Sequence, residues 1–499
     1  VPTMIDLKAL RSDPERFRKG AADKNYDCDI DALLAADTAL RAALTEHQEL
    51  LASKNRISKL MGQKIGQAKQ LEGKLNKARA AGLDPKSEEF QALVSQVDEV
   101  QVLAQGFQKE AEQLKQQEQE LDGRVKELAA IRDKQWLTVP QPADTDVPVG
   151  KSADDNVPLR TWHATGGFDP RKTFEDNKGF APKSHIELGQ ALGLFEFERG
   201  VKMAGSRSYI LTGDGMRLHN AVLQFAFNYM TGTHGFQAMS VPVMVREELM
   251  VGTGFFPGGR DQAYHIEETA RGGGHDMFLT GTGEVGLMGV HQGEILDEED
   301  LPKCYTTVST CFRREAGSAG KDTAGLYRIH QFDKVEQVVV CKADEQESRN
   351  WHAKMISYVE GILKQLELPY RLLQCCTGDL GMKNADMIDV ECWMPSRCEP
   401  GKTAADDDSA PGGNASGGWG ETHSASRLYD YQTRRLNLRY RTIDADGKKQ
   451  TVFCHSLNNT VAASPRILIP LIEVHQNADG SITIPEALRP YMGGQEKIG

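Results

Sequence analysis

The sequence of 499 residues lacks several features that mark particular protein classes. It has no apolar run near the ~20 residues that a membrane-spanning helix requires. Its first residues contain neither the basic nor the apolar region of a signal peptide, so we expect a cytoplasmic protein that does not associate with membranes. Nine cysteines are an odd number, and they form no Cys-x-x-Cys pair or cluster with zinc spacing. This pattern favours reduced thiols over disulfides or a zinc site.

Excess positive charge is also missing, because the net charge is −12. For the whole chain this argues weakly against a nucleic-acid partner. Between residues 50 and 80, however, eight basic side chains accompany a single acid, Glu72. A local basic segment on an acidic protein is typical of a phosphate-binding surface, and a solvated helix face is the alternative. The basic residues are Lys54, Arg56, Lys59, Lys64, Lys69, Lys74, Lys77 and Arg79.

Two segments show the apolar spacing of long helices. Residues 86–135 carry apolar side chains at alternating intervals of three and four, which is the seam of a coiled coil, interrupted chiefly by Glu118. Residues 33–75 show the same period less cleanly, and Gly82 and Pro85 lie between the two. We predict an antiparallel helical hairpin. At ~45 residues per helix it is roughly 70 Å long, and we expect it to project because it has little core of its own.

The remaining sequence predicts an α+β domain. Residues 1–137 form the predicted hairpin domain, and residues 138–156, rich in Pro, Asp and Gly, are interpreted as a linker. Residues 157–499 contain short β-branched and aromatic runs in succession, which favours a mostly antiparallel sheet flanked by helices. Within them, residues 399–420 contain almost no apolar side chain, and we interpret them as a mobile insertion. The runs are Ser208–Leu211, Tyr305–Phe312, Val335–Val340, Arg371–Gln374, Ile388–Trp393 and Gln450–Cys454.

The densest group of chemically capable residues lies between Phe312 and Glu336. Two strand-like runs flank a polar loop, and they carry Arg313, Glu315 and Arg328 in addition to Glu336. Guanidinium groups form bidentate hydrogen bonds with phosphates, and a carboxylate can hold Mg²⁺ or an amine. The predicted hairpin therefore suits a polyphosphate ligand. A structural network of salt bridges is the alternative.

The wording of this segment resembles motif 2 of the class II aminoacyl-tRNA synthetases, and from Cys311 onward it resembles the seryl enzymes in particular. The resemblance implies a class II catalytic domain that uses ATP. It implies that Arg313 holds the ATP α-phosphate and the serine carboxylate, that Glu315, Ile329 and Phe332 contact ATP with Phe332 stacked on adenine, that Arg328 holds the γ-phosphate, and that Glu336 receives the serine ammonium group.

Two further segments resemble the other class II motifs. Residues 464–473 place Arg466 ahead of an apolar run, as in motif 3, and the resemblance implies that Arg466 grips the γ-phosphate from the face opposite Arg328. The apolar run could equally be plain core. Residues 218–229, a predicted helix, and the extended residues 237–242 are similar to motif 1. In the family these elements build the dimer interface, so we expect a homodimer.

The resemblance also extends to the amino-acid pocket. The sequence Leu-Thr-Gly-Thr-Gly-Glu that ends at Glu284 is similar to the Thr-x-Glu loop of the seryl enzymes, which implies that Thr282, Gly283 and Glu284 close over serine. Asn458 and Thr460 match the position that touches the serine hydroxyl, although such residues are usually turn residues. A pocket that hydrogen-bonds a hydroxyl rejects an analogue without one by up to about 10⁴–10⁵.

Further likeness concerns the metal and the tRNA. Glu421 and Ser424 align with family positions that contact the Mg²⁺ bound with ATP, and oxygen ligands suit this ion. In the family the N-terminal hairpin grips the long variable arm of serine tRNA, which implies that the eight basic residues bind tRNA. We expect a serine–tRNA ligase acting on ATP, L-serine and serine tRNA. The alternatives are a paralogue that loads another acceptor or gives antibiotic self-protection, and a coiled-coil interaction protein with a decayed catalytic domain.

Overall fold

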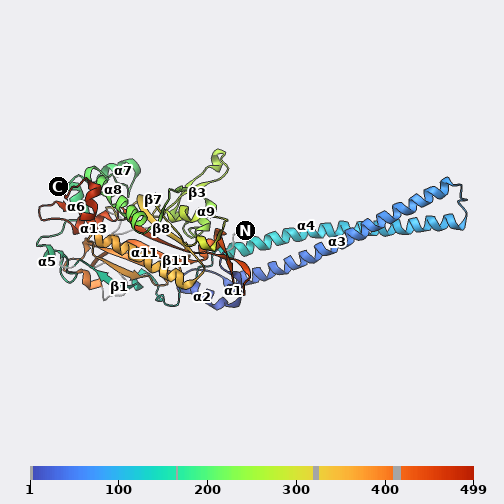
Figure 1. Ribbon diagram of the computed structural model, residues 1–499, viewed down its shortest axis with the longest axis horizontal. Helices are drawn as coiled ribbons and strands as arrows, with labels where there is room; N and C mark the ends of the chain where they lie inside the picture. Colours follow the sequence, from blue (N-terminus) through green and yellow to red (C-terminus); the bar gives the residue numbers. More distant parts are fainter. Residues whose placement is uncertain (1–3, 165–166, 318–324, 408–416, 445) are drawn as a thin grey trace. The chain divides into compact units, whose positions relative to one another are not determined.

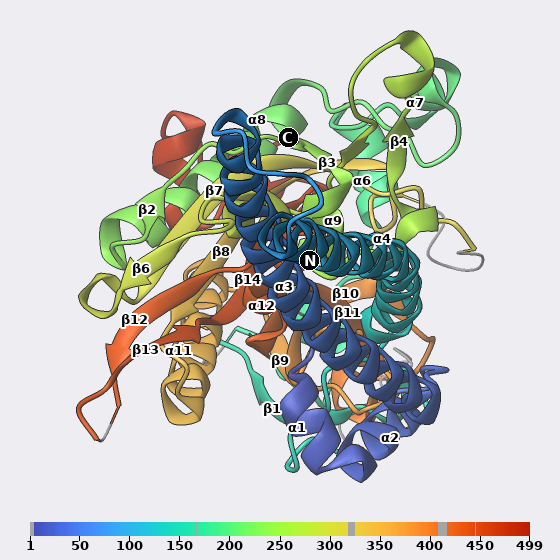
Figure 2. The same ribbon diagram turned by 90° about the vertical axis from the view of Figure 1, so that its right-hand side faces the viewer.

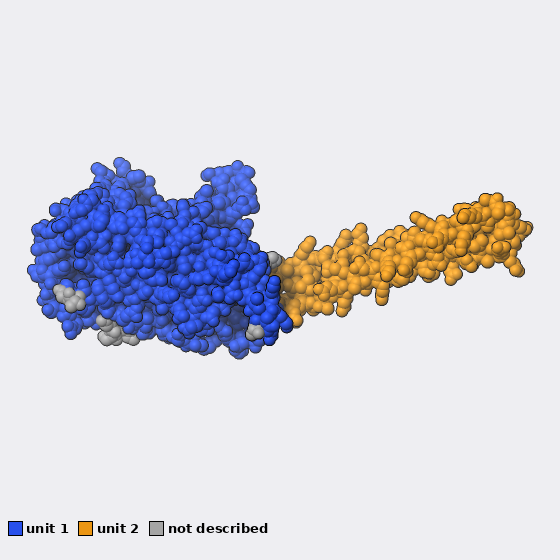
Figure 3. Space-filling model, viewed as in Figure 1, with its two compact units in different colours: residues 1–28, 139–499 blue, residues 29–138 orange. Residues whose placement is uncertain are grey.

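The computed structural model divides into two compact units, residues 29–138 and residues 1–28 with 139–499 (Figure 3). Of the residues that we assigned to the hairpin domain, 4–28 thus belong to the larger unit. The α+β fold expected from the sequence is confirmed. No helix among the described residues is both long and apolar enough to cross a bilayer. The structure describes residues 4–164, 167–317, 325–407, 417–444 and 446–499.

The smaller unit is the predicted helical hairpin. Helices α3 (Ile30–Ala80) and α4 (Glu88–Leu137) lie side by side (Figures 1 and 2). The Asp29 side chain caps α3 and the Ser87 side chain caps α4, each accepting a hydrogen bond from a backbone N–H of the first turn. Gly82 stands in the connecting turn with a φ of +77°, a conformation that glycine adopts without strain.

The predicted seam of this hairpin is confirmed, and its charged interruption is paired. Phe90, Val97 and Leu121 are buried on α4. Glu118, which interrupts the apolar pattern of α4, forms an ion pair with Lys54, a polar interruption of α3. A charge opposite a charge in the seam fixes the register of the two helices.

The larger unit is built on an eight-stranded sheet. All its pairings are antiparallel except that of β2 with β7, so the mostly antiparallel sheet is confirmed. The prediction of a strand at residues 208–211 is wrong. This segment connects α7 to α8 and forms a single isolated β-bridge, between Leu211 and Phe195. The strand order is β1 (Val157–Trp162), β9 (Tyr370–Gln374), β10 (Asp386–Cys398), β11 (Gly417–Tyr429), β14 (His455–Ser464), β8 (Gln331–Cys341), β7 (Lys303–Phe312) and β2 (Gln237–Ala238).

Helices and small sheets complete this unit. The helices are α1 (Leu7–Ser12), α2 (Pro14–Asp23), α5 (Phe174–Lys178), α6 (His185–Ala191), α7 (Phe197–Ala204), α8 (Gly213–Asn228), α9 (Glu247–Gly252), α10 (Glu284–Gly289), α11 (Glu345–Gln365), α12 (Tyr431–Arg435) and α13 (Leu468–Val474). The small sheets are β3 (Met244–Arg246), β5 (Met277–Leu279) and β4 (Tyr264–Ile266); β13 (Lys449–Phe453), β12 (Arg439–Ile443) and β6 (Ile295–Asp297); and β15 (Ile482–Thr483) with β16 (Lys497–Ile498).

The two faces of the large sheet have different roles, and β8 shows this most clearly. Val335 and Val339 belong to the main apolar core, together with residues of α8 and α11. Successive side chains of a strand point to opposite faces. Lys334 and Glu336 therefore lie on the other face, although both are buried. One face of the sheet packs on helices and the other is available for polar chemistry.

The predicted linker, residues 138–156, is packed rather than free. Gln141 donates its backbone N–H to the Met382 carbonyl at 2.8 Å. The Asp144 carboxylate forms an ion pair with the buried Arg427. Backbone hydrogen bonds and a buried ion pair hold this segment although its sequence shows no apolar period.

The predicted insertion, residues 399–420, belongs to the fold at both ends. Ala404 and Trp419 are buried, and the Trp419 indole N–H donates to the Ala404 carbonyl at 2.9 Å. Residues 417–420 form the start of β11. The interpretation of the whole segment as mobile is therefore wrong for these parts, because two buried side chains fix them. Residues 408–416 lie outside the described residues.

Candidate functional site

The site begins at the open end of the β7–β8 hairpin. The two strands pair antiparallel, with Cys311 opposite Phe332, so the predicted hairpin is confirmed. Arg313 directly follows the last residue of β7, and Arg328 lies a short distance before Gln331, the first residue of β8. The two arginines are thus brought to the same end of the sheet. The predicted polar loop between them includes residues 318–324, which lie outside the described residues.

A β-bulge in β11 places Glu421 and Ser424 on the same face of the sheet. Residues three apart in a regular strand point to opposite faces. The register of β11 shifts by one residue here, so that Glu421 lies opposite Glu391 and Ser424 lies opposite Asp389. Because those partners are two residues apart on β10, they share a face, and Thr422 is the extra residue.

The neighbouring strand β14 has a second bulge of the same kind. Thr460 lies opposite Glu336 and Ala463 lies opposite Lys334, so the extra residue is Val461. The partners on β8 again share a face. Both bulges direct side chains three residues apart toward the polar face of the sheet.

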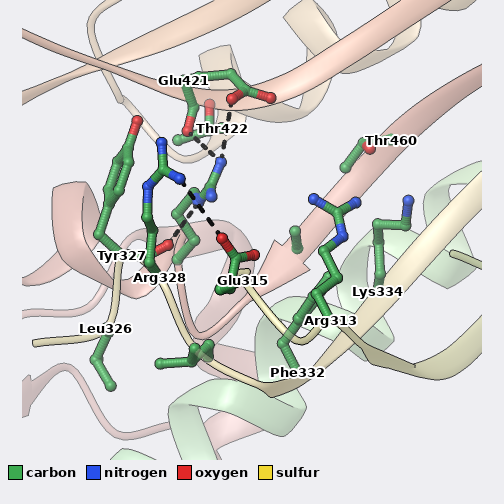
Figure 4. Close-up of a pocket in the computed structure, with 13 residues that line it drawn as sticks. Arg313, Glu315, Leu326, Tyr327, Arg328, Phe332, Lys334, Glu421, Thr422 and Thr460 are labelled. Atoms are coloured by element: carbon green, nitrogen blue, oxygen red, sulfur yellow. Dashed lines mark hydrogen bonds and ion pairs between the residues drawn. The ribbon is translucent and has the colours of Figure 1, made fainter. Parts of the chain in front are cut away.

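These elements enclose a pocket with about 490 Å³ of empty volume. Arg313 and Arg328 from the β7–β8 hairpin and Arg466 from the segment ahead of α13 all line it (Figure 4). In that view Glu315 lies between Arg313 and Arg328. Three guanidinium groups around one cavity suit a polyphosphate. The other lining residues are Glu315, Leu326, Tyr327, Ile329, Phe332, Lys334, Glu421, Thr422, Thr460 and Ala463.

Carboxylates and aromatic rings orient the arginines. Arg328 pairs with Glu315 at 3.5 Å, and Arg466 pairs with Glu421 at 3.4 Å. The Arg466 Nε also donates to the Tyr327 carbonyl at 3.1 Å, and its guanidinium lies 4.4 Å from the Tyr327 ring centroid. Burial raises the pKa of Tyr327 to about 12. Tyr327 was not predicted as a site residue, because only the fold brings it to Arg466.

Beside this pocket lies a buried polar group formed by β8 and the loop between β5 and α10. Thr282 donates its hydroxyl to Glu336 at 3.1 Å and accepts a hydrogen bond from Lys334 at 2.7 Å. Lys334 and Glu336 form an ion pair. Burial raises the pKa of Glu336. Lys334 was absent from the predicted site, although its place between Phe332 and Glu336 in an alternating strand was a usable signal.

The Glu284 carboxylate is the centre of a second buried network. Lys383 Nζ lies 2.6 and 2.7 Å from its two oxygens. Gln432 and Asn458 donate their side-chain amides to Glu284 Oε1 at 2.7 and 2.6 Å. Asn458, predicted to contact serine, thus also holds Glu284. Lys383 and Gln432 were not predicted, because their contacts join segments far apart in the sequence.

Gly283, between Thr282 and Glu284, packs closely against β7. A Cβ atom at this position would lie 2.6 Å from Thr307 Cγ2 and 2.9 Å from Ser309 Oγ. Both distances are shorter than the contacts that Cβ atoms make in folded proteins. The absence of a side chain therefore sets how closely the loop approaches the strand.

Comparisons with known proteins show the family of the chain. The profile "Seryl-tRNA synthetase N-terminal domain" matches residues 4–142, and "tRNA synthetase class II core domain (G, H, P, S and T)" matches residues 264–475. A relative from Deinococcus radiodurans, "Serine--tRNA ligase", is 38% identical over 496 residues, which cover 99% of each chain. The chain belongs to the seryl-tRNA synthetase family.

Solved structures of this family have the same fold. The seryl-tRNA synthetase of Pyrococcus horikoshii, complexed with ATP, matches with a TM-score of 0.74 and 31% identity, covering 99% of both chains. The cytoplasmic serine-tRNA ligase of Naegleria fowleri, in complex with AMP, matches with a TM-score of 0.74 and 26% identity, covering 100% of this chain and 99% of that one. A "Serine--tRNA ligase" of Rhodococcus jostii is 36% identical over 491 residues, 98% of this chain and 99% of the relative.

The basic residues of α3 in this family member differ in their surroundings. Lys54 is paired with Glu118, and the Arg79 guanidinium lies 5.9 Å from the Phe90 ring centroid. At about 100° per residue, four others fall within roughly 60° of one another around the helix. All four are exposed, on the side away from the seam: Arg56, Lys59, Lys74 and Lys77.

Proposed function

We propose that the chain is a serine–tRNA ligase that activates L-serine with ATP and transfers serine to the 3′ end of serine tRNA. One observation carries this proposal: Arg313, Arg328 and Arg466 line a single pocket. Thr460 and Lys334 line the same pocket and connect it to the buried Glu336 group. Family membership along the full chain supports the same activity. No contact described above favours a paralogue with another acceptor or a decayed catalytic domain.

For the first step, we assign the phosphates of ATP to the three arginines. Arg313 holds the α-phosphate and the serine carboxylate, while Arg328 and Arg466 hold the γ-phosphate. Phe332, whose ring centroid lies 5.3 Å from the Arg313 guanidinium, stacks on adenine, and Glu315 accepts from the adenine amino group. Ile329 contacts the nucleotide from the pocket wall.

The chemistry is a displacement at phosphorus. A serine carboxylate oxygen attacks the α-phosphorus as the bond to pyrophosphate breaks, giving seryl-adenylate. A ribose hydroxyl at the tRNA 3′ end then attacks the seryl carbonyl, and AMP leaves. No enzyme nucleophile is required. The protein contributes position and fixed positive charge, which are the main sources of catalysis in such transfers.

Glu421 and Ser424 fit a divalent cation bound with ATP, for which we propose Mg²⁺. Both offer oxygen atoms, and the β-bulge places them on the same face of the sheet. The Glu421 side chain is 45% exposed and lines the nucleotide pocket, whereas Ser424 lies outside the lining. The ion supplies charge neutralisation on the phosphates when bound.

Serine is recognised in the buried group beside the phosphates. We assign its ammonium to Glu336 and its hydroxyl to Thr460, with Thr282, Gly283 and Glu284 forming the loop over it. Thr460 and Glu336 lie opposite each other in the sheet, so both can contact one small molecule. Alanine would leave buried polar groups unpaired, which is the physical basis of selection.

The tRNA and a second copy of the chain complete the proposal. We assign the serine tRNA to the basic residues of α3, because the family places this substrate on its N-terminal hairpin. We further propose a homodimer formed through α8 and the extended segment 237–242, and a cytoplasmic location.

The test compares two adjacent arginines. Arg313→Ala should nearly abolish serine-dependent ATP–pyrophosphate exchange, because it removes the positive charge next to the reacting phosphate. The circular dichroism spectrum should remain unchanged. Arg314→Ala is the matched control, since Arg314 lines a different cavity. Exchange by the Arg313 variant at the rate of the Arg314 variant would contradict the assignment.

A further inference from the structure

Two carboxylates share the buried serine pocket, and each has its own lysine. Glu284 and Glu336 are 3% and 1% exposed. Burial raises the pKa of Glu336, and the charge of Glu284 adds to this rise. Two like charges in a dry pocket repel one another strongly. Lys334 offsets Glu336, and Lys383 offsets Glu284.

The contact of Lys383 with Glu284 has the geometry of a fixed clamp. Its Nζ lies 2.6 and 2.7 Å from the two carboxylate oxygens, and the lysine side chain is only 14% exposed. The ammonium group also lies 4.1 Å from the centroid of the Phe255 ring. Gln432 and Asn458 both donate to Oε1, whereas Lys383 reaches both oxygens.

The backbone that carries Lys383 is held from the N-terminal segment. Lys24 donates its Nζ to the carbonyl of Gly381 at 3.1 Å and to the carbonyl of Asn384. The Asn384 side-chain amide donates to Ser426 Oγ on β11 at 2.8 Å. These bonds fix the loop on both sides of Lys383, so its ammonium group has a defined position.

We propose that Lys383 is a positioning residue for serine binding, acting through Glu284 on Thr282. Glu284 follows Thr282 by two residues, so fixing its carboxylate fixes the loop that carries the Thr282 hydroxyl. That hydroxyl donates to Glu336, the carboxylate assigned to the serine ammonium group. Lys383 thereby shapes the serine pocket without touching the amino acid. This inference rests on the proposed function.

The first experiment measures serine-dependent ATP–pyrophosphate exchange by the full chain. Lys383→Met should raise the KM for serine about tenfold or more, because it leaves a buried carboxylate without its partner. The KM for ATP should change less than about twofold, since Lys383 does not line the nucleotide pocket. Lys383→Arg keeps the charge and should fall between wild type and Lys383→Met. The matched control is Lys342→Met, which breaks a surface pair with Glu298 at 3.0 Å and should leave both constants unchanged.

A double-mutant cycle separates a positioning role from a merely structural one. In a chain that already carries Glu284→Gln, adding Lys383→Met should leave the KM for serine unchanged, because the intermediary is gone. The double variant has no unpaired charge, so it serves even if Lys383→Met alone does not fold.

Three results would overturn the inference: an unchanged serine KM in Lys383→Met, an equal rise in the KM for ATP, or additive effects in the cycle. Absence of serine-dependent exchange in the wild-type chain would instead overturn the proposed function.

Discussion

At Gly283, one absent methyl group sets the distance between β7 and the loop that carries Thr282 and Glu284. A Cβ atom there would lie 2.6 Å from Thr307 Cγ2. Gly283→Ala should therefore displace Thr282 and Glu284 and raise the KM for serine about tenfold, since overpacking typically costs ~1–3 kcal/mol. The KM for ATP should remain within about twofold. Steady-state exchange kinetics measure both constants.

A second substitution tests the cause of this effect. Thr307→Ser removes the methyl group that a Cβ at position 283 would meet, so the double variant should recover much of the serine affinity. Gly273→Ala, in a loop where the added Cβ meets the Glu268 carbonyl, is a glycine control outside the site. A double variant no better than Gly283→Ala would show that the Thr307 contact is not the cause.

Single residues differ in how far the sequence could assign them. The three arginines were predictable because each stands in a motif with a recognisable order, and the structure brings them to one pocket. Lys383 and Gln432 were not, because they meet Glu284 across 99 and 148 residues of chain. Such contacts depend on the register of distant segments, which no local pattern specifies.

Among elements, α3 allows the proposed tRNA contacts to be ranked. Lys59 and Lys74 are exposed on the outer side of the helix, whereas Lys54 is engaged with Glu118. Lys59→Ala and Lys74→Ala should each weaken binding of serine tRNA. Each should also reduce the slope of log binding constant against log salt concentration by about one, which corresponds to the loss of one phosphate contact. Lys54→Ala should have a smaller effect on binding. Filter binding at several salt concentrations measures these slopes.

The stability of the hairpin provides a control for this ranking of tRNA contacts. Lys54→Ala leaves Glu118 without its partner in the seam, so the thermal stability of the hairpin should fall more than in Lys59→Ala. Equal loss of tRNA affinity in all three variants would contradict the outer-face assignment.

The periodicity of the sequence predicted the hairpin itself, because a repeat sustained over fifty residues is a strong signal of a helix. The strand at 208–211 was wrong, because a short β-branched run does not reveal whether a neighbouring strand exists.

For the whole molecule, Lys24 predicts a pH dependence of stability. Burial lowers its pKa from the ordinary 10.5 to about 7, and Asp144 opposes this shift. Between pH 7 and 10.5 the unfolded chain binds a proton that the folded chain lacks. The contribution of Lys24 to the free energy of unfolding therefore rises with pH across this window. Below about pH 7 the buried ammonium group destabilises the folded chain to its full extent.

Thermal unfolding at pH 7, 8 and 9 measures this dependence. The stability that Lys24→Met gains relative to wild type should be largest at pH 7 and should decrease steadily as the pH rises. Lys19→Met is the control, since Lys19 is 69% exposed on α2, the helix that ends immediately before Lys24, and its difference from wild type should not vary with pH. A pH-independent difference for Lys24→Met would contradict the lowered pKa.

The two bulges of β11 and β14 give the catalytic face a strict spacing. Deleting Thr422 would remove the bulge and place Glu421 and Ser424 two residues apart in a regular strand, so that both would keep the same face. Deleting Val461 would likewise leave Thr460 and Ala463 on one face. A regular strand that kept Thr422 or Val461 without its bulge would instead turn Glu421 away from the face of Ser424, or Thr460 away from the face of Ala463, while leaving every proposed ligand in the chain.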